Sequence, residues 1–324
     1  DGKYCVSAGH DRTVRLWNPT RIDPAYHHNH HPNTLSSSSN ETERSLNSVP
    51  HALPIQSYTD GHTHPISAIT LDETSTTLLS TSDKTLIVTD VITQKVKRRL
   101  QGHMGRINSV ALSRDASVFI SASYDGTVRL WDGRSRSSKP LQTLDEAKDS
   151  VSSVKILHSD VSAGWNDTEI VTASIDGALR CYDLRRGLVH VDDLGSNVAL
   201  TSVSHTSDRL CSVVSCLDGA IHRVERSTAV LLNTCYGGHV AGKYSLECHV
   251  TADDRFVVSG SEDGSAVIYD FVKGGVVQRL DGHGRATCTV ACHPNREHTS
   301  VMITGSYDGN AIVWTNGSGA YRND

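Results

Sequence analysis

The stretch that decides the fold is residues 120–132, Ile-Ser-Ala-Ser-Tyr-Asp-Gly-Thr-Val-Arg-Leu-Trp-Asp. Apolar and small residues alternate on both sides of Tyr-Asp-Gly, and an Asp-Gly pair between two such runs is a strong signal for a β-hairpin. The pattern recurs along the chain with an aspartate in each turn: Asp11, Asp83, Asp125, Asp176, Asp218, Asp263 and Asp308. Six residues after each aspartate comes one fixed position, filled by Trp17, Thr89, Trp131, Tyr182, Val224, Tyr269 and Trp314. The sequence therefore contains seven copies of one hairpin.

The composition favours an all-β protein. Of 324 residues, 37% are hydrophobic, only 5% are aromatic and 25 are glycine, which suits many short strands and tight turns. The formal net charge of -5 provides no general attraction to nucleic acid or to anionic membrane. No apolar run approaches the ~20 residues of a membrane span, and the beginning lacks the layout of a signal peptide. We therefore expect no membrane contact and no direct, sequence-specific nucleic-acid binding.

The eight cysteines show no Cys-x-x-Cys pair, and most lie in strand-like runs. We interpret them as reduced core thiols of an intracellular protein. Cys288 and Cys292 resemble metal ligands, but on one strand they would be ~13 Å apart, at ~3.3 Å per residue, which is too far to share an ion. The sequence predicts neither a metal site nor a cofactor.

The repeats have a regular period. Successive turn aspartates are 72, 42, 51, 42, 45 and 45 residues apart, and Gly-His pairs at His62, His103, His239 and His283 open four of the repeats. A period of ~40 to 45 residues with Gly-His and Trp-Asp resembles the WD-repeat family, whose repeats are four-stranded propeller blades. The resemblance implies a single domain over residues 1–324, a seven-bladed β-propeller.

Two insertions interrupt this period. A His/Ser-rich insertion at about residues 19–54 is too polar to order itself, so we expect it to be disordered. Its histidines could bind metal, but a polar low-complexity loop is the preferred interpretation. The second insertion, residues 158–169, exposes Trp165, which either contacts a partner or packs on its own blade. Because residue 1 falls at the second strand of the first repeat, we also expect an N-terminally incomplete propeller with about 26 of 28 strands.

The WD-repeat resemblance implies a buried hydrogen-bond network in each complete repeat, from indole to hydroxyl to imidazole to turn carboxylate. Repeats three and seven contain all four members: His103, Ser121, Asp125 and Trp131, and His283, Thr304, Asp308 and Trp314. Repeat six has His239, Ser259 and Asp263 but Tyr269 at the tryptophan position, and repeat four has Thr172, Asp176 and Tyr182 without a Gly-His pair. Repeats two and five are degenerate. A Ser-His-Asp arrangement that recurs in several blades indicates a structural role, because a catalytic triad is built once, at one cleft. We therefore predict no catalytic residues and no enzyme.

Several stretches resemble more closely the mitogen-activated protein kinase organizer family of WD-repeat proteins. The most distinctive is Leu-Gln-Thr-Leu-Asp-Glu-Ala-Lys-Asp at residues 141–149, followed by Val-Ser-Ser-Val-Lys at residues 151–155, where a Gly-His pair would normally stand. The resemblance implies a scaffold for a kinase cascade, in cytoplasm and nucleus, a monomer within larger complexes. The alternative that it implies is a structural component of the spliceosome. One basic stretch favours this second role: Arg134, Arg136, Lys139, Arg185 and Arg186.

Protein partners are expected at the rim that carries the aspartate turns and the Gly-His loops, because one network joins these two sets of segments. Binding concentrates on loops held by a rigid scaffold, and Tyr and Arg are enriched in interface hot spots. The predicted rim residues precede the turn aspartates or lead into the first strands: His10, Arg106, Tyr124, Lys243, Tyr244, Glu262, Arg285 and Tyr307.

Overall fold

The computed structural model describes residues 4–22, 52–59, 61–157, 169–194, 198–235 and 237–315. These residues form 26 β-strands and one short 3-10 helix, η2 (Arg296–His298). The strands are β1 (Cys5–Ala8), β2 (Val14–Ile22), β3 (Ala52–Tyr58), β4 (Ile66–Leu71), β5 (Thr77–Ser82), β6 (Thr85–Asp90), β7 (Val96–Gln101), β8 (Ile107–Leu112), β9 (Val118–Ser123), β10 (Val128–Asp132), β11 (Gln142–Leu144), β12 (Val151–Leu157), β13 (Glu169–Ser174), β14 (Ala178–Asp183), β15 (Gly187–Asp193), β16 (Leu200–His205), β17 (Cys211–Cys216), β18 (Ile221–Glu225), β19 (Leu231–Cys235), β20 (Cys248–Val250), β21 (Phe256–Gly260), β22 (Ser265–Asp270), β23 (Val276–Asp281), β24 (Thr287–Cys292), β25 (Met302–Ser306) and β26 (Ala311–Trp314).

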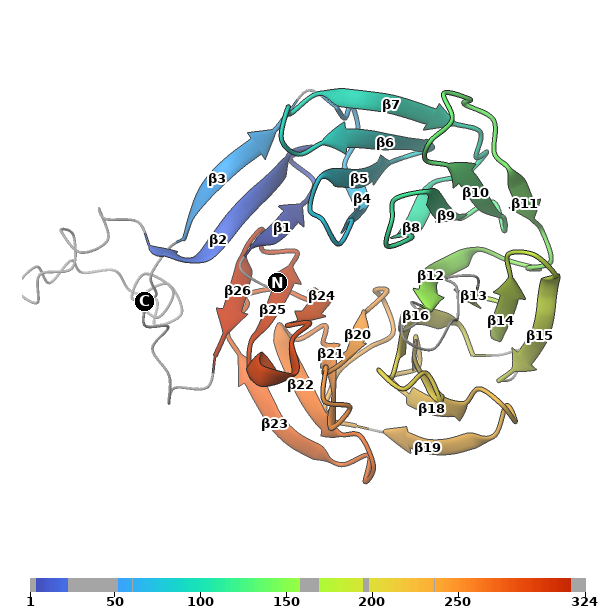
Figure 1. Ribbon diagram of the computed structural model, residues 1–324. Coiled ribbons are helices and arrows are strands. Elements are labelled where there is room, and N and C mark those ends of the chain that lie inside the picture. Colours follow the sequence, from blue (N-terminus) through green and yellow to red (C-terminus); the bar gives the residue numbers. More distant parts are fainter. Residues whose placement is uncertain are drawn as a thin grey trace, which may run out of the picture.

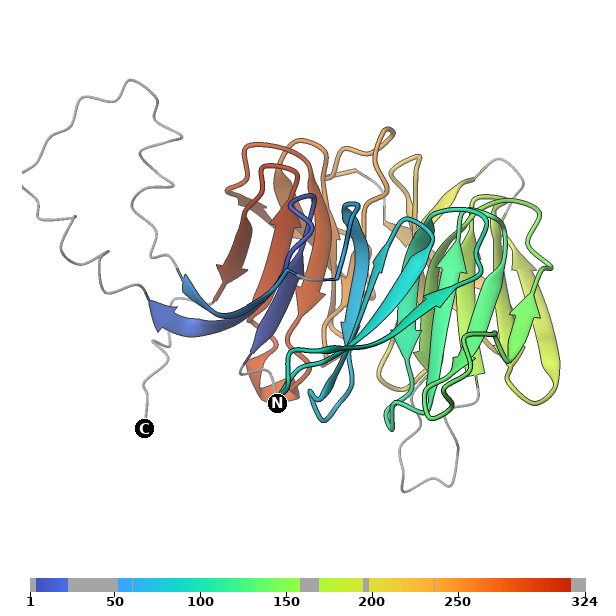
Figure 2. The same ribbon diagram turned by 90° about the horizontal axis from the view of Figure 1, so that it is seen from above.

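The strands form seven antiparallel sheets arranged as blades in a ring (Figure 1). Blade 1 is β1 to β3, blades 2 to 6 contain four strands each from β4 to β23, and blade 7 is β24 to β26. Figure 2 shows the ring from its edge, where the blades form a flat disc. The described strands thus confirm the predicted all-β, seven-bladed propeller and the predicted number of 26 strands.

Asp-Gly turns join the second and third strands of most blades. In blade 3, Gly126 has a φ of +76°, a left-handed conformation that glycine adopts without strain. In blade 6, Gly264 has a φ of +89°, and a Cβ there would lie 2.4 Å from the carbonyl oxygen of His283. Glycine thus allows both the hairpin turn and the close approach of the loop that leads into the next blade.

The His/Ser-rich insertion separates β2 from β3, and its edges differ from the prediction. The sequence placed the insertion at about 19–54, but β2 continues to Ile22 and β3 begins at Ala52, with Ile22 opposite Ala52. Pairing of the two strands therefore extends a few residues into the polar segment. The rest of the insertion, and residues 158–168 with Trp165, lie outside the described residues.

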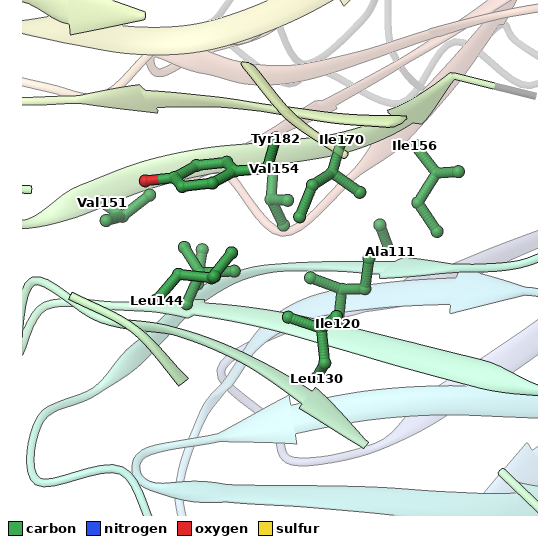
Figure 3. Close-up of a cluster of buried hydrophobic side chains, with 11 residues drawn as sticks. Ala111, Ile120, Leu130, Leu144, Val151, Val154, Ile156, Ile170 and Tyr182 are labelled. Atoms are coloured by element: carbon green, nitrogen blue, oxygen red, sulfur yellow. The ribbon is translucent and has the colours of Figure 1, made fainter. Parts of the chain in front are cut away.

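The hydrophobic core lies between neighbouring blades. Figure 3 shows the cluster between blades 3 and 4, where Ile120 and Leu130 face Val154 and Ile170. Similar clusters of buried side chains lie at each interface from blades 1–2 to blades 6–7. Because blades 2 to 6 each pack on two neighbours, their strands carry apolar residues on both faces and are largely buried.

Side-chain hydrogen bonds tie the inner strands to one another around the central axis. In four successive blades, a hydroxyl or amide near the start of the inner strand donates to a backbone carbonyl of the next blade. These bonds are Ser67 Oγ to Ile107 (2.6 Å), Asn108 Nδ2 to Val151 (2.9 Å), Ser152 Oγ to Leu200 (2.7 Å) and Thr201 Oγ1 to Leu246 (3.1 Å). The inner ring is thereby a rigid support for the loops above it.

Candidate protein-interaction site

One face of the disc, called the turn face here, is formed by the aspartate turns and by the loops that lead into the inner strands. The residue before each aspartate often donates its backbone N–H to a carbonyl of such a loop. Tyr124 donates to Arg106 (2.8 Å), Glu262 to Val240 (2.8 Å) and Tyr307 to Ala286 (3.1 Å). These bonds hold turn and loop together, so side chains on this face project from a fixed backbone.

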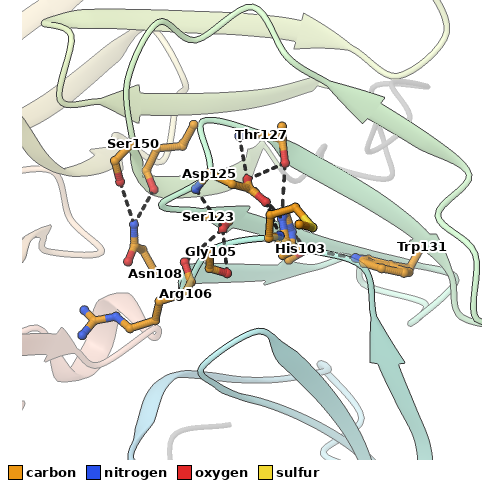
Figure 4. Close-up of polar contacts among 12 residues, drawn as sticks. His103, Gly105, Arg106, Asn108, Ser123, Asp125, Thr127, Trp131 and Ser150 are labelled. Carbon is orange, nitrogen blue, oxygen red and sulfur yellow. Dashed lines mark hydrogen bonds and ion pairs between the residues drawn. The ribbon is translucent and has the colours of Figure 1, made fainter.

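The network of blade 3 lies directly beneath this face (Figure 4). Trp131 Nε1 donates to Ser121 Oγ (2.9 Å), Ser121 Oγ lies 2.8 Å from His103 Nε2, and His103 Nδ1 lies 3.0 Å from Asp125 Oδ2. Because Ser121 accepts the indole proton, its own proton goes to Nε2, and His103 is a neutral donor to Asp125 through Nδ1. All four side chains are thereby satisfied.

Burial and hydrogen bonds shift the ionisation of this network. Burial lowers the pKa of His103, because the charged form loses its hydration, although Asp125 acts in the opposite direction. Burial alone would raise the pKa of Asp125, but the hydroxyl of Thr127, the N–H of Met104 and His103 together hold it far below its usual value. The pair therefore stays as neutral imidazole and carboxylate near neutral pH.

Blade 7 contains the same arrangement. Trp314 Nε1 donates to Thr304 Oγ1 (2.8 Å), which lies 2.8 Å from His283 Nε2, and His283 Nδ1 lies 3.0 Å from Asp308 Oδ2. The N–H of Gly284 also donates to Asp308, as that of Met104 does to Asp125. Both networks thus fasten a lead-in loop to the adjacent turn.

Replacing His103 with alanine is expected to lower the free energy of unfolding by about 1 to 3 kcal/mol, since Ser121 and Asp125 lose a buried partner. His62→Ala is the matched control, because Nδ1 of His62 has no partner and less is lost. Chemical denaturation of the two variants and the parent measures the difference. Equal midpoints for His103→Ala and the parent would contradict the assigned network.

Blade 4 uses a different closure that the sequence did not predict. It lacks the Gly-His pair, and Arg180 takes its place by donating from both terminal nitrogens to Asp176 (3.1 and 2.6 Å). Burial would raise the pKa of Asp176, but Arg180, Ser174 and backbone N–H groups outweigh it and lower the pKa to about 2. An arginine four residues after the turn aspartate does not reveal this closure by itself. Arg129 has the same spacing from Asp125 in blade 3, where the aspartate pairs with His103.

Blade 6 also departs from the predicted partial network of His239, Ser259 and Asp263. His239 Nδ1 lies 2.6 Å from the hydroxyl of Tyr269, which donates to the carbonyl of Gly237. Asp263 instead pairs with Arg279, and Ser259 donates to the carbonyl of Gly260. The phenol at the tryptophan position therefore redirects the imidazole away from the turn.

The predicted rim residues converge from distant parts of the chain. Tyr244 and Tyr307 have ring centroids 5.0 Å apart, and the ring of His10 lies 6.3 Å from that of Tyr307. These three residues, called the aromatic cluster below, come from the lead-in loop of blade 6 and the turns of blades 7 and 1. Burial raises the pKa of Tyr307 and the positive charge of Arg106 opposes it, so Arg106 acts on the same cluster from blade 3.

The other predicted rim residues also lie on the turn face. Glu262 accepts from the backbone N–H groups of Lys243 and Tyr244, which holds the lead-in loop of blade 6 in place. Tyr124 is 68% exposed and Arg285 is exposed, but neither joins the aromatic cluster in a described ring contact. Figure 4 shows the Arg106 side chain pointing away from the network of its own blade.

Further charged residues lie on the same face. Asp145 and Asp149 lie in the loop that leads into blade 4, with Lys148 between them, and Asp218 lies in the turn of blade 5, all exposed. Asp11 and Asp263, in the turns of blades 1 and 6, are also exposed. The turn face therefore carries charges of both signs around the ring.

Comparison with known proteins decides the family. The model of the WD domain, G-beta repeat, matches residues 1–18, 53–90, 94–132, 230–270 and 274–315, more than half of the chain. The chain belongs to the WD40 family. Strands β11 to β18, which include all of blade 4 and most of blade 5, lie outside these matches. WD40 propellers are generally non-catalytic and bind other proteins, which agrees with a face built of fixed, exposed side chains.

Relatives extend the similarity over the propeller. A WD repeat domain-containing protein 83 homolog of Dictyostelium discoideum is 28% identical over 97% of this chain and 91% of its own length. WD repeat domain-containing protein 83 of Rattus norvegicus is 39% identical over 50% of this chain and 47% of its own, and that of Homo sapiens is 35% identical over 53% and 51%. The matched part thus spans about half the length of these two mammalian relatives.

No helix in the described ranges is long and apolar enough to cross a membrane. Within the same ranges, no group of three or more His, Cys, Asp or Glu side chains is placed to hold a metal ion.

Proposed function

We propose that this WD40 propeller is a non-catalytic scaffold that assembles components of a mitogen-activated protein kinase cascade, in cytoplasm and nucleus, as a monomer within larger complexes. The resemblance of residues 141–155 to the kinase organizer family supports this role. So does the similarity to WD repeat domain-containing protein 83 and its homolog.

The aromatic cluster is the observation that carries the proposal. Tyr244 and Tyr307 are 43% and 45% exposed, so each ring is half held by the propeller and half free to contact a partner. Tyrosine provides a large contact area at a low entropic cost, and arginine is enriched with it in hot spots. The positive charge of Arg106 opposes the effect of burial on the pKa of Tyr307, so its field reaches the cluster. A rigid, preorganised patch of this kind is suited to binding proteins and not to catalysis.

A spliceosomal role is the second candidate, through the basic stretch of blades 3 and 4. This stretch lies on the connections between third and fourth strands, at the face opposite the turn face. Arg134 pairs there with Asp115 at 2.9 Å, and both side chains are more than half exposed. Arg136 and Lys139 are exposed and remain the residues that would meet an acidic partner.

Replacing Arg106 and Tyr307 together with alanine is expected to weaken binding of kinase-cascade proteins at least about tenfold, the scale of a hot-spot loss. The thermal midpoint should change little, because both side chains are largely outside the core. Affinity capture from native lysate measures the effect, with kinases and splicing factors scored separately.

The matched control is Arg136→Ala with Lys139→Ala on the opposite face. Loss of kinase capture by this variant, with the first variant unaffected, would move the site away from the aromatic cluster. Capture of splicing factors alone, lost in the Arg136 and Lys139 variant, would establish the spliceosomal role instead.

A further inference from the structure

A cavity of about 70 Å³ lies between blades 1 and 2. Blade 1 contributes Val14 and Tyr58 to its wall, and blade 2 contributes His62, Leu78, Ser80 and Thr89. The hydroxyl of Tyr58 donates across the interface to the carbonyl of Val91 (3.2 Å), which holds one wall in place. Gln94 also lines the cavity and is exposed, so the cavity opens to the surface on that side.

The cavity occupies the place of an aromatic side chain in other blades. Trp131 of blade 3 pairs with Phe119 and packs toward blade 2, as part of the cluster between these blades. Thr89 pairs with Leu78 in the same register and faces blade 1. A threonine side chain is much smaller than an indole. Thr89 therefore leaves open the space that Trp131 fills at the equivalent position of blade 3.

In blade 2, only one of the two ring nitrogens of His62 has a hydrogen-bond partner. Its Nε2 lies 2.7 Å from Ser80 Oγ, as in a complete network, but its buried Nδ1 has no hydrogen-bond partner. The hairpin turn is one residue shorter than in blade 3, and Asp83 adopts a φ of +50°, so its carboxylate is not placed to accept from His62. The cavity therefore retains the histidine and the serine of the network but lacks the tryptophan indole and a paired aspartate carboxylate.

We propose that this cavity binds a planar aromatic ring that carries a hydrogen-bond donor, an indole or a phenol, between blades 1 and 2. The propeller itself shows both docking modes. An indole N–H donates to the serine hydroxyl in blade 3. In blade 6, a phenol hydroxyl donates to the carbonyl of Gly237 and accepts from Nδ1 of the histidine. Ser80 and His62 offer the same two groups at the cavity.

The volume determines how such a ring binds. A closed cavity of ~150 Å³ holds benzene, so about 70 Å³ does not enclose a whole indole. The ring must enter through the open side with its N–H edge first and leave its other edge near Gln94. Partial burial of a nine-atom ring predicts weak binding, with a Kd of about 1 mM.

The test is a titration of the propeller with indole, followed through the methyl NMR signals of Val14, Leu78 and Val96. We expect saturable shifts of these signals. Benzofuran, which has the same shape without the N–H, should bind several-fold more weakly, as expected for one lost hydrogen bond. Shifts that do not saturate, or that spread evenly over all methyl groups, would overturn the proposal.

Thr89→Trp is the decisive variant, because it places an indole of the chain itself in the cavity. Indole binding should fall at least tenfold, and Thr89→Phe should have a similar effect if the larger ring prevents folding. Unchanged indole binding in a folded variant would refute the site. The source of the ring is tested by capture of kinase-cascade proteins, an arm that rests on the proposed function. A loss of capture with Thr89→Trp identifies a partner's aromatic side chain, and unchanged capture excludes these proteins as its source.

Discussion

Replacing Arg180 with methionine is expected to lower the free energy of unfolding by about 3 kcal/mol or more, because the variant leaves Asp176 buried without its charge partner. The side chains of Arg180 and Asp176 are only 5% and 9% exposed, so water cannot replace the lost bonds. Methionine keeps most of the aliphatic volume, so the loss reports on charge rather than on packing.

The chain contains a matched control for this variant. Arg15 pairs with Asp11 at 2.6 Å in blade 1, with the same spacing in the hairpin, but these side chains are 36% and 44% exposed. Arg15→Met is expected to cost less than about 1 kcal/mol, as exposed pairs do. Chemical denaturation at pH 7 compares the two. Equal losses would mean that burial does not determine the strength of the Arg180 pair.

The pH dependence provides a second measure of the same pair. The lowered pKa of Asp176 contributes stability that is present above about pH 4, the ordinary value of an aspartate, and is lost as the pH falls toward the folded value of about 2. Arg180→Met removes much of this contribution. The difference in stability between parent and variant should therefore narrow as the pH falls from about 4 to about 2.

Trp131→Ala is expected to destabilise the propeller by about 3 to 5 kcal/mol, the range for large aromatic residues in a core. The side chain is 1% exposed, packs in the cluster between blades 2 and 3, and donates to Ser121. The variant therefore opens a cavity and removes one bond of the network. Thermal and chemical unfolding measure the change.

Two further variants separate the contributions. Trp131→Phe keeps most of the ring and should recover a large part of the loss, leaving about 1 kcal/mol for the missing N–H. Trp314→Ala removes the equivalent residue of blade 7, which is only partly buried, and should cost less than Trp131→Ala. A similar cost for Trp131→Phe and Trp131→Ala would show that the hydrogen bond, and not the packing, is the main contribution.

Local patterns in the sequence determined the number and type of the blades. The Asp-Gly turn, the alternation of apolar residues and the position six residues after the aspartate all lie within thirteen residues, so each copy specifies its own hairpin. The pairs of His103 with Asp125 and of His283 with Asp308 were implied by the WD-repeat resemblance, and each joins a turn to the loop of its own blade.

Tertiary structure alone decided the features that depend on several segments. The residues of the aromatic cluster are up to 297 positions apart in the sequence and meet only because the ring of blades closes. Arg180 replaces the histidine of blade 4 because a buried carboxylate must be paired, and the local pattern does not say which side chain reaches it. In blade 2, a turn shorter by one residue redirects Asp83, so a histidine and an aspartate that the sequence placed in one repeat do not meet.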